Sequence, residues 1–237
     1  MDLKARLEKE ARAAGAAYFG IADLSRVNQG EITAYESKLI AQYPLAISIG
    51  VPLLDGIVDG IEVQDDSNAL KNYWFHVYEV INPLINSIAI RISQLIEGQG
   101  YKALQVPASH TVDAPNLYGL FSHKIAASLA GLGWIGKSCL LVTPDRGTRV
   151  RWGTVLTDAP LKPDKPFSGK GCGGCTLCVD NCPSGAFTGR PFSPSEPREA
   201  RMDAAKCFRY LFEEQKRKTG AEACGMCVNV CPFGRNN

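Results

Sequence analysis

Apolar and polar residues alternate with two different periods over the first 160 residues of the chain. In "DLKARLEKEARAAGA" the apolar positions Leu3, Leu7 and Ala11 recur at helical spacing, which predicts a helix with one buried face. Short apolar runs predict strands at "AYFGIADL", "LAISIGVPL" and "KALQVPA". The stretch at 66–100 starts at a plausible N-cap, ends at glycines and predicts one long helix, bent or broken at Pro83.

These elements lack the regular strand, helix, strand alternation of a doubly wound sheet. They predict an α+β fold, with helices layered on a sheet. A segment rich in Pro, Lys and Gly, "APLKPDKPFSGKG", follows at 159–171, and the composition beyond it changes to Cys, Gly, Pro and Arg. We therefore expect two domains, 1–160 and 161–237.

A glycine-rich loop separates a predicted helix from a predicted hairpin. Phe121, Ile125 and Leu129 share one helical face and lead into "AGLGWIGKSC", after which "CLLVTPDRGTRVRWGTVLTDAPL" has two β-rich runs around a turn. The loop fits both G-x-G-x-x-G and the P-loop pattern, but each of these needs a strand before the glycines and a helix after them. Because the order here is reversed, we interpret the glycines as a tight turn with close backbone approach.

Charge and hydropathy exclude several classes of protein. The net charge is only +2 over 237 residues, and no concentrated basic face indicates nucleic-acid binding. The N-terminus is charged throughout, unlike a signal peptide, and no apolar run approaches the length of a membrane span. We expect a cytoplasmic protein with no membrane partner.

Eight of the nine cysteines follow residue 170 and have the spacing of iron–sulfur ligands. "CGGCTLCVDNCP" is the C-x2-C-x2-C-x3-C-P run of bacterial ferredoxins, and "CGMCVNVCP" is a shortened copy of it. The fourth cysteine of such a run ligates the other cluster. We therefore predict two 4Fe–4S clusters, the first held by Cys172, Cys175, Cys178 and Cys231 and the second by Cys182, Cys207, Cys224 and Cys227.

Zinc is the alternative metal for these cysteines, but it favours C-x2-C pairs separated by a dozen or more residues, which this spacing fits poorly. A segment of this size buries little apolar surface, so we expect the clusters to hold it together and their chelation or oxidation to unfold it. The ninth cysteine, Cys139, has no recognisable base beside it, and we interpret it as a small core residue rather than a nucleophile.

Three stretches carry a family resemblance: "AGLGWIGK" is similar to epoxyqueuosine reductases, whereas "LLVTPDRGTRVR" and "VLTDAPL" are similar to reductive dehalogenases. Residues 106–235 thus resemble members of the superfamily of cobalamin-dependent iron–sulfur enzymes, which contains both the epoxyqueuosine reductases and the reductive dehalogenases. The resemblance implies a nitroreductase-like first domain that binds a corrinoid close to a cluster. It also implies that the glycine loop contacts this corrinoid through Gly131, Gly133, Trp134, Gly136 and Lys137, with plain core packing as the alternative for Trp134.

Proton donors and an anion site are expected near the same loop. Asp113 in "VDAP" resembles the proton-donating Asp of epoxyqueuosine reductases, with a turn or N-cap as the alternative role. Tyr118 is a candidate phenolic donor. Arg149 and Arg151 alternate on one predicted strand. One interpretation is that they bind an anionic substrate or cofactor tail, and the alternative is that they form a solvated edge of the sheet.

Together these features predict a reductase in which two clusters relay electrons to a corrinoid that reduces a small or nucleoside-like substrate. The chain ends six residues after Cys231, without the helical-repeat extension that helps epoxyqueuosine reductases hold tRNA, which argues against a tRNA substrate. Ferredoxin or flavodoxin is the expected electron donor. The alternatives are a ferredoxin-like carrier, an activator of a partner corrinoid protein, and a reductase that holds flavin.

Overall fold

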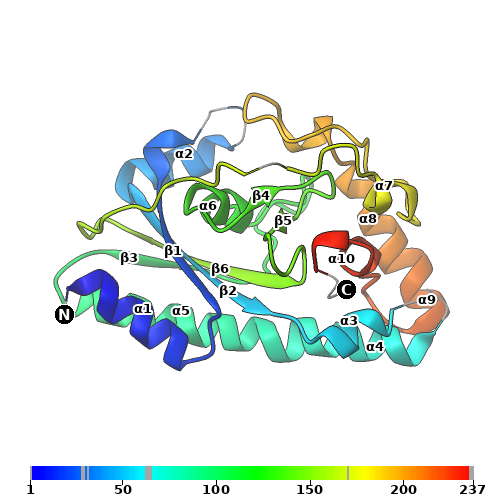
Figure 1. Cartoon of the computed structure of the whole chain (residues 1–237), viewed down its shortest axis with the longest axis horizontal. Helices are drawn as coiled ribbons and strands as arrows, with labels where there is room; N and C mark the ends of the chain where they lie inside the picture. Colours follow the sequence, from blue (N-terminus) through cyan, green and yellow to red (C-terminus); the bar gives the residue numbers. More distant parts are fainter. Residues whose placement is uncertain (1, 28–29, 31, 62–65, 170, 235–237) are drawn as a thin grey trace.

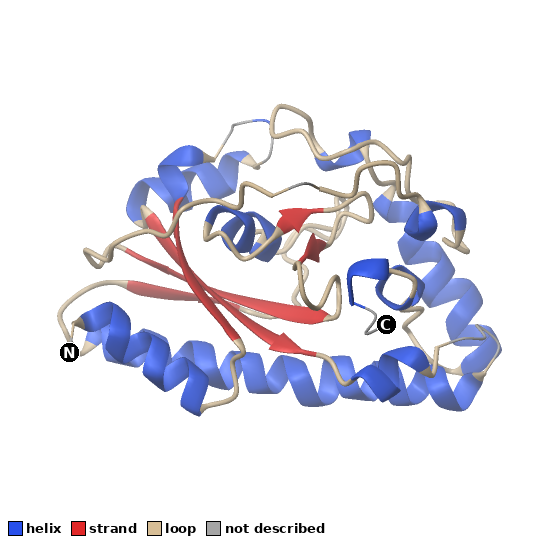
Figure 2. Cartoon of the chain, in the orientation of Figure 1, coloured by secondary structure: helices blue, strands red, loops and turns tan. Residues whose placement is uncertain are grey.

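An antiparallel four-stranded sheet with helices on both faces forms the centre of the protein (Figure 1, Figure 2). The computed structural model describes residues 2–27, 30, 32–61, 66–169 and 171–234. The strands lie in the order β1, β2, β6 and β3, with bounds Tyr18–Asp23, Leu45–Pro52, Val150–Thr157 and Ala103–Val106. The three strands expected before residue 110 are confirmed, as is the mixture of helices and strands.

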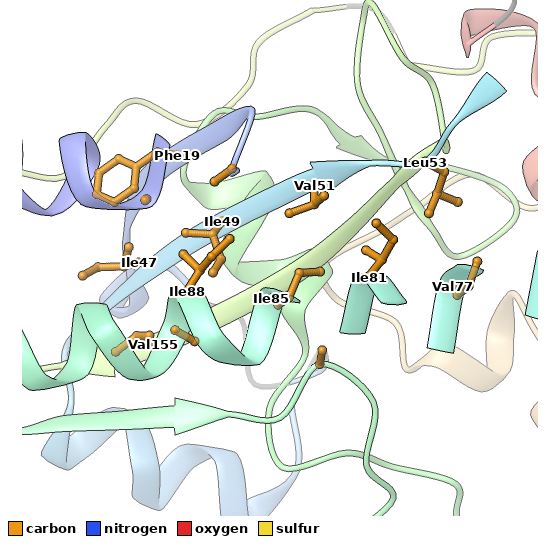
Figure 3. Packing of buried hydrophobic residues seen from close by; sticks show 14 of the residues in the cluster. Phe19, Ile47, Ile49, Val51, Leu53, Val77, Ile81, Ile85, Ile88 and Val155 are labelled. Atoms are coloured by element: carbon orange, nitrogen blue, oxygen red, sulfur yellow. The ribbon is translucent and has the colours of Figure 1, made fainter. Parts of the chain in front are cut away.

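One face of the sheet is covered by α1 (Leu3–Ala13) and α5 (Asn82–Glu97). Ile47 and Ile49 of β2 point towards α5, where they meet Ile85 and Ile88 (Figure 3). These four side chains are at most 1% exposed. Since burying an isoleucine side chain contributes about 1.5–3 kcal/mol, this layer is a main source of stability.

The predicted long helix runs through residues 67–97 without breaking. It consists of α4 (Ser67–Trp74), a π-helical stretch η3 (Phe75–Ile81) and α5. Pro83 lies in the first turn of α5, directly after the π-helical stretch. A break at Pro83 was therefore the wrong expectation, because the wider turns before the proline accommodate its missing N–H.

The other face carries α6 (His123–Leu129) and α2 (Ala34–Gln42), and a short 3-10 turn η1 (Leu24–Arg26) follows β1. Small residues of the sheet, Ala22 and Ala46, are fully buried here, which allows α6 to approach closely. The sequence analysis did not predict α2. Its signal is a capping box at its N-terminus, which is short and easily overlooked.

The glycine loop starts as a Schellman motif at the end of α6. Gly131 has φ +80°, its N–H donates to the Ser128 carbonyl at 3.1 Å, and the Leu132 N–H donates to the Ala127 carbonyl at 3.0 Å. This is the hydrogen-bond pattern in which a glycine ends a helix. The interpretation of the loop as a tight turn from a helix into a strand is thus confirmed.

The expected hairpin after the loop is only partly correct. Thr143 and Gly147 exchange backbone hydrogen bonds of 2.8 and 3.0 Å around the turn. However, the two flanking strands do not pair: β5 (Leu141–Val142) pairs with β4 (Trp134–Ile135), whereas β6 joins the large sheet. The apolar pattern predicts strands but does not encode which strands pair.

The cysteine segment is made of short helices, and two of them contact each other. These are α7 (Leu177–Asp180) and α10 (Met226–Asn229). The segment packs on the first part of the chain through α9 (Lys216–Thr219) against α4 and through α10 against α3 (Asp55–Asp59). Its remaining elements are η4 (Arg198–Ala200), α8 (Ala204–Arg209), η5 (Tyr210–Gln215) and η6 (Pro232–Gly234). Across the described ranges, no helix is long and apolar enough to cross a membrane.

Candidate functional site

The fold brings the cysteines of the two runs close together, and the thiol neighbours of Cys178 and of Cys224 indicate two groups. Burial and the neighbouring thiols of Cys172, Cys231 and Cys175 raise the pKa of Cys178 to about 11. The first group thus combines three cysteines of the first run with one from the second.

In the second group, burial raises the pKa of Cys224 to about 12, and the nearby thiols of Cys207 and Cys182 act in the same direction. The pKa of Cys227 is raised mainly by burial, and then by the thiols of Cys224, Cys207 and Cys182 and, as the last contribution, by Cys178 of the first group. Within the described part of the chain, no three His, Cys, Asp or Glu side chains converge closely enough to hold a single metal ion. A cubane binds each cysteine at a separate corner iron, so its ligands do not meet at one point. The donor set therefore fits two clusters.

The glycine loop lies against protein rather than facing an open space. A Cβ atom on Gly131 would collide with the carbonyl oxygen of Lys165, and one on Gly133 with the carbonyl oxygen of Val142. At Gly136 it would lie 2.7 Å from Cγ2 of Val142 and 3.3 Å from the Sγ atom of Cys172. The close backbone approach thus serves the packing of this loop against Val142 of β5, the segment at Lys165 and, at Gly136, the Cys172 side chain.

Trp134 and Lys137 also face the first cysteine run. The Trp134 Nε1–H donates to Sγ of Cys172 at 3.4 Å. The Lys137 ammonium donates to the carbonyl oxygens of Gly173 and Cys175, both at 3.0 Å. The structure therefore places both residues beside the first group of cysteines and outside the cavity described next.

A cavity of about 390 Å³ lies between α6, β6 and the cysteine segment. It is next to both cysteine groups, because Thr148 in its wall donates to the carbonyls of Cys227 and Val228 at 3.3 Å and is also hydrogen-bonded to Cys231. Its volume falls in the range in which proteins hold small molecules and cofactors. The residues that line it include Val106, Pro107, Ser109, Phe121, Ile135, Leu140, Leu141, Val150, Trp152 and Phe192.

The charged groups of the cavity are mostly cations. Lys124, Arg151, Arg198 and Arg201 line it, whereas Glu36 is the one carboxylate among the lining residues described. Burial lowers the pKa of Lys124, and among the described residues its ammonium has no hydrogen-bond or ion-pair partner. Lys124, Arg198 and Arg201 were not among the predicted site residues, since the wall of the cavity is assembled from segments far apart in the chain.

The two predicted proton donors have different positions. The Asp113 carboxylate caps a turn, accepting from the backbone N–H of Asn116 at 3.2 Å and from its side-chain amide at 2.9 Å, and it does not line the cavity. Tyr118 does line it, and its hydroxyl donates to Glu199 at 3.0 Å. The Arg198 guanidinium lies 4.1 Å from the centre of the Tyr118 ring. Burial raises the pKa of Tyr118, so its phenol stays protonated at neutral pH.

Two of the three histidines, His110 and His123, and the ninth cysteine also line the cavity. Both ring nitrogens of His123 are engaged, Nδ1 with the Thr154 hydroxyl at 2.8 Å and Nε2 with the Pro107 carbonyl at 3.0 Å. Burial lowers the pKa of His123 to about 4, so the ring is neutral. His110 and Cys139 are further lining residues, and Cys139 is only 4% exposed. This burial agrees with a packing role for Cys139.

Arg149 has a structural position rather than one in the cavity. It is 1% exposed, and its guanidinium donates to Asp55 at 3.0 Å and to Asp59 at 2.6 Å. It therefore joins β6 to α3, next to the cysteine segment. Its neighbour Arg151 does line the cavity, and its guanidinium donates to the side-chain oxygen of Asn82 at 3.2 and 3.0 Å.

We expect Arg149→Met to lower the free energy of unfolding by about 2 kcal/mol, since hydrogen bonds to charged groups contribute roughly 1.5–3 kcal/mol. Denaturant unfolding under anaerobic conditions measures this loss. Arg26→Met is the matched control: Arg26 forms a 3.4 Å pair with Asp23 at the surface, where ion pairs contribute about 0–1 kcal/mol. Equal losses in the two variants would contradict the structural role of Arg149.

The fold and the two cysteine groups define this chain as an iron–sulfur protein with a cavity beside its clusters. Residues 171–234 match the family model described as a 4Fe-4S double cluster binding domain, which confirms the predicted pair of clusters. About half to two thirds of the chain is similar in sequence to epoxyqueuosine reductases. It is 36% identical over 123 residues to the epoxyqueuosine reductase of Bacillus cereus, a match that covers 48% of this chain and 30% of that protein.

The corresponding enzyme of Pseudomonas aeruginosa is 32% identical over 169 residues, covering 67% of this chain and 41% of that protein. Solved structures share the fold at 20% identity. A catabolic reductive dehalogenase in complex with 3-bromo-4-hydroxybenzoic acid has a TM-score of 0.67 over 97% of this chain and 31% of its own. An epoxyqueuosine reductase with a tRNA stem loop has a TM-score of 0.63 over 98% of this chain and 65% of its own.

These similarities confirm the resemblance to epoxyqueuosine reductases in sequence, and they show that reductive dehalogenases share the fold. The matches cover 30% and 41% of the lengths of the two curated relatives, so the chain corresponds to only part of each. What those proteins bind and reduce is therefore a matter of proposal for this chain.

Proposed function

We propose that this protein is an iron–sulfur reductase that passes electrons from two 4Fe–4S clusters to a group bound in the cavity. The observation that carries the proposal is the position of Val228, which lines the cavity and lies in the sequence between Cys227 of the second group and Cys231 of the first. A carrier without a substrate needs no such cavity. We further propose the predicted ligand sets for the clusters, with a boundary between the two parts of the chain near residue 160.

The group proposed for the cavity is a corrinoid. When bound, a corrinoid supplies a cobalt centre that takes up electrons and reacts with the substrate. The cavity fits part of such a molecule, because apolar residues such as Leu141 and Trp152 share its wall with the cations Lys124, Arg151 and Arg201. Apolar walls suit a macrocycle, and the ammonium of Lys124, which has no partner among the residues that the structure describes, suits an anionic tail or substrate group. A whole corrinoid is larger than the cavity, so its remainder would extend outwards.

Tyr118 is the proton donor that the geometry favours. Its phenol faces the cavity and remains protonated at neutral pH, as a general acid requires. The guanidinium of Arg198 over the ring stabilises the phenolate that is left after transfer. Asp113 exchanges backbone hydrogen bonds of 3.1 Å with Tyr118, which makes it a positioning residue in this scheme. The substrate is proposed to be small or nucleoside-like, with ferredoxin or flavodoxin as donor.

The test is metal analysis of protein purified without oxygen from cells supplied with cobalamin. We expect about eight irons per chain, the content of two four-iron clusters, and close to one cobalt. Ser109→Trp, which places an indole in the exposed part of the cavity wall, should abolish cobalt binding and leave the iron unchanged.

Ala41→Trp is the control, since Ala41 is exposed in α2 and lies outside the cavity. Iron without cobalt would favour the carrier or activator, and flavin in place of cobalt would favour the flavin reductase. Cobalt retained in full by Ser109→Trp would contradict the cavity as the binding site.

A further inference from the structure

Lys137 is a buried cation that forms no ion pair within the described ranges of the chain. The residue is 9% exposed, and its ammonium donates to two carbonyl oxygens of the first cysteine run. No carboxylate in the described part of the chain forms an ion pair with it. Burying a charge that lacks a counter-ion is strongly unfavourable. The fold therefore implies a negative charge beside Lys137 that the side chains of the described residues do not supply.

The first cluster would supply that charge. Four thiolates outweigh the charge of a cubane core, so the assembled centre is an anion. Two of its proposed ligands flank the carbonyl groups that hold Lys137: Gly173 follows Cys172, and the second carbonyl belongs to Cys175 itself. The ammonium is thus fixed at the edge of the cluster site, in a region with little solvent to screen it.

Trp134 supplies a second interaction with the same ligand. Its indole N–H donates to Sγ of Cys172 at 3.4 Å. The ring is held by Phe167 and Phe233, whose ring centres lie 5.2 and 4.9 Å away. Hydrogen bonds to the ligand sulfurs and nearby charge are among the features that set the potential of an iron–sulfur cluster.

We propose that Trp134 and Lys137 raise the reduction potential of the first cluster above the value that it would have without them. On reduction the cluster takes up one electron from the external donor, and no bond or proton changes place. The reduced form carries one more negative charge, so the ammonium and the indole N–H stabilise it more than the oxidised form. The inference rests on the proposed ligand set, Cys172, Cys175, Cys178 and Cys231.

The experiment is an anaerobic redox titration of the whole protein with dithionite, followed by electron paramagnetic resonance. Trp134→Phe keeps an aromatic ring but removes the N–H, and Lys137→Met keeps the stem but removes the charge. We expect each to shift the potential of one cluster to a more negative value. The other cluster is an internal reference and should not move.

Two controls separate a specific effect from a general change of charge. Lys137→Arg should retain most of the parent potential because it keeps the cation. Lys165→Met removes an exposed lysine whose backbone lies against the glycine loop, and it should leave both potentials unchanged. Unshifted potentials in Trp134→Phe and Lys137→Met, or equal shifts of both clusters, would overturn the proposal.

Iron analysis distinguishes this failure from a failure of the cluster assignment. A parent protein with clearly fewer than about eight irons would overturn both the assignment and the inference before any potential is measured. If Lys137→Met loses a cluster, the potential of that cluster has to be tested in Trp134→Phe alone. A more negative potential of one cluster in Trp134→Phe then supports the proposal, and an unshifted potential refutes it.

Discussion

Cys178→Ala and Cys231→Ala should each remove the same cluster, although the two residues are more than fifty positions apart in the chain. We expect the iron content to fall from about eight to about four per chain and the proposed reductase activity to be lost. The physical reason is that three ligands from one run leave one corner of the cubane to be filled from the other run. Iron analysis combined with electron paramagnetic resonance identifies which signal disappears.

Cys182→Ala and Cys227→Ala should remove the other cluster. The signal that survives in these variants should be the one whose potential responds to Trp134→Phe. Cys139→Ala is the control, because Cys139 is buried beside the cavity and belongs to neither group. If Cys178→Ala and Cys182→Ala abolished the same signal, each run would hold its own cluster and the crossed assignment would be refuted.

Activity should fail in both sets of variants if the clusters form one relay. Loss of the second cluster leaves the first cluster in place. A variant that still turns over without the second cluster would therefore show that electrons can bypass the second cluster. Binding in the cavity should remain at least partly intact, since Val228 and Thr148 contribute only part of its wall. Retained ligand with lost turnover is thus the signature of a broken relay.

The sequence predicted the elements whose signal is local. The strand β2 was predicted because "LAISIGVPL" is a short apolar run, and the cysteine groups because cluster ligation imposes a fixed spacing. The helix α2 was not predicted, because its apolar stripe is weak and its start depends on one capping box. The pairing of β5 with β4 depends on which strands the fold brings together, and the pattern along one strand does not specify this.

The candidate site was less accessible from sequence for a related reason. Arg149 and Arg151 alternate on one predicted strand, and both looked suitable for binding an anion. The structure separates them, because Arg149 finds Asp55 and Asp59 far upstream in the chain. Lys124 lies in a helix that looked unremarkable, and only the assembled fold places its ammonium in a cavity with few anions. Long-range partners decide whether a charged residue is structural or available to a ligand.

Gly131→Ala should be among the most destabilising substitutions outside the cysteines. Gly131 has φ +80°, where a side chain is strained, and an added Cβ would also meet the carbonyl oxygen of Lys165. The backbone strain costs about 1–3 kcal/mol and the overpacking about 1–3 kcal/mol, which gives a loss of roughly 4 kcal/mol. For a chain of this length we expect the thermal midpoint of the holoprotein to fall by about 10 °C.

Gly100→Ala separates the two causes of this loss. Gly100 has nearly the same conformation, φ +84°, but an added Cβ has nothing within 4 Å. It should therefore cost only the strain of the left-handed conformation, about 1–2 kcal/mol. Gly131→Ala should in addition weaken retention of the first cluster, because the segment around Lys165 leads directly into the first cysteine run, and the N–H of Phe167 in it donates to the Ser128 carbonyl at 3.4 Å. Equal melting temperatures for the two variants would mean that the contact with Lys165 contributes nothing, and the glycine would then serve only to end α6.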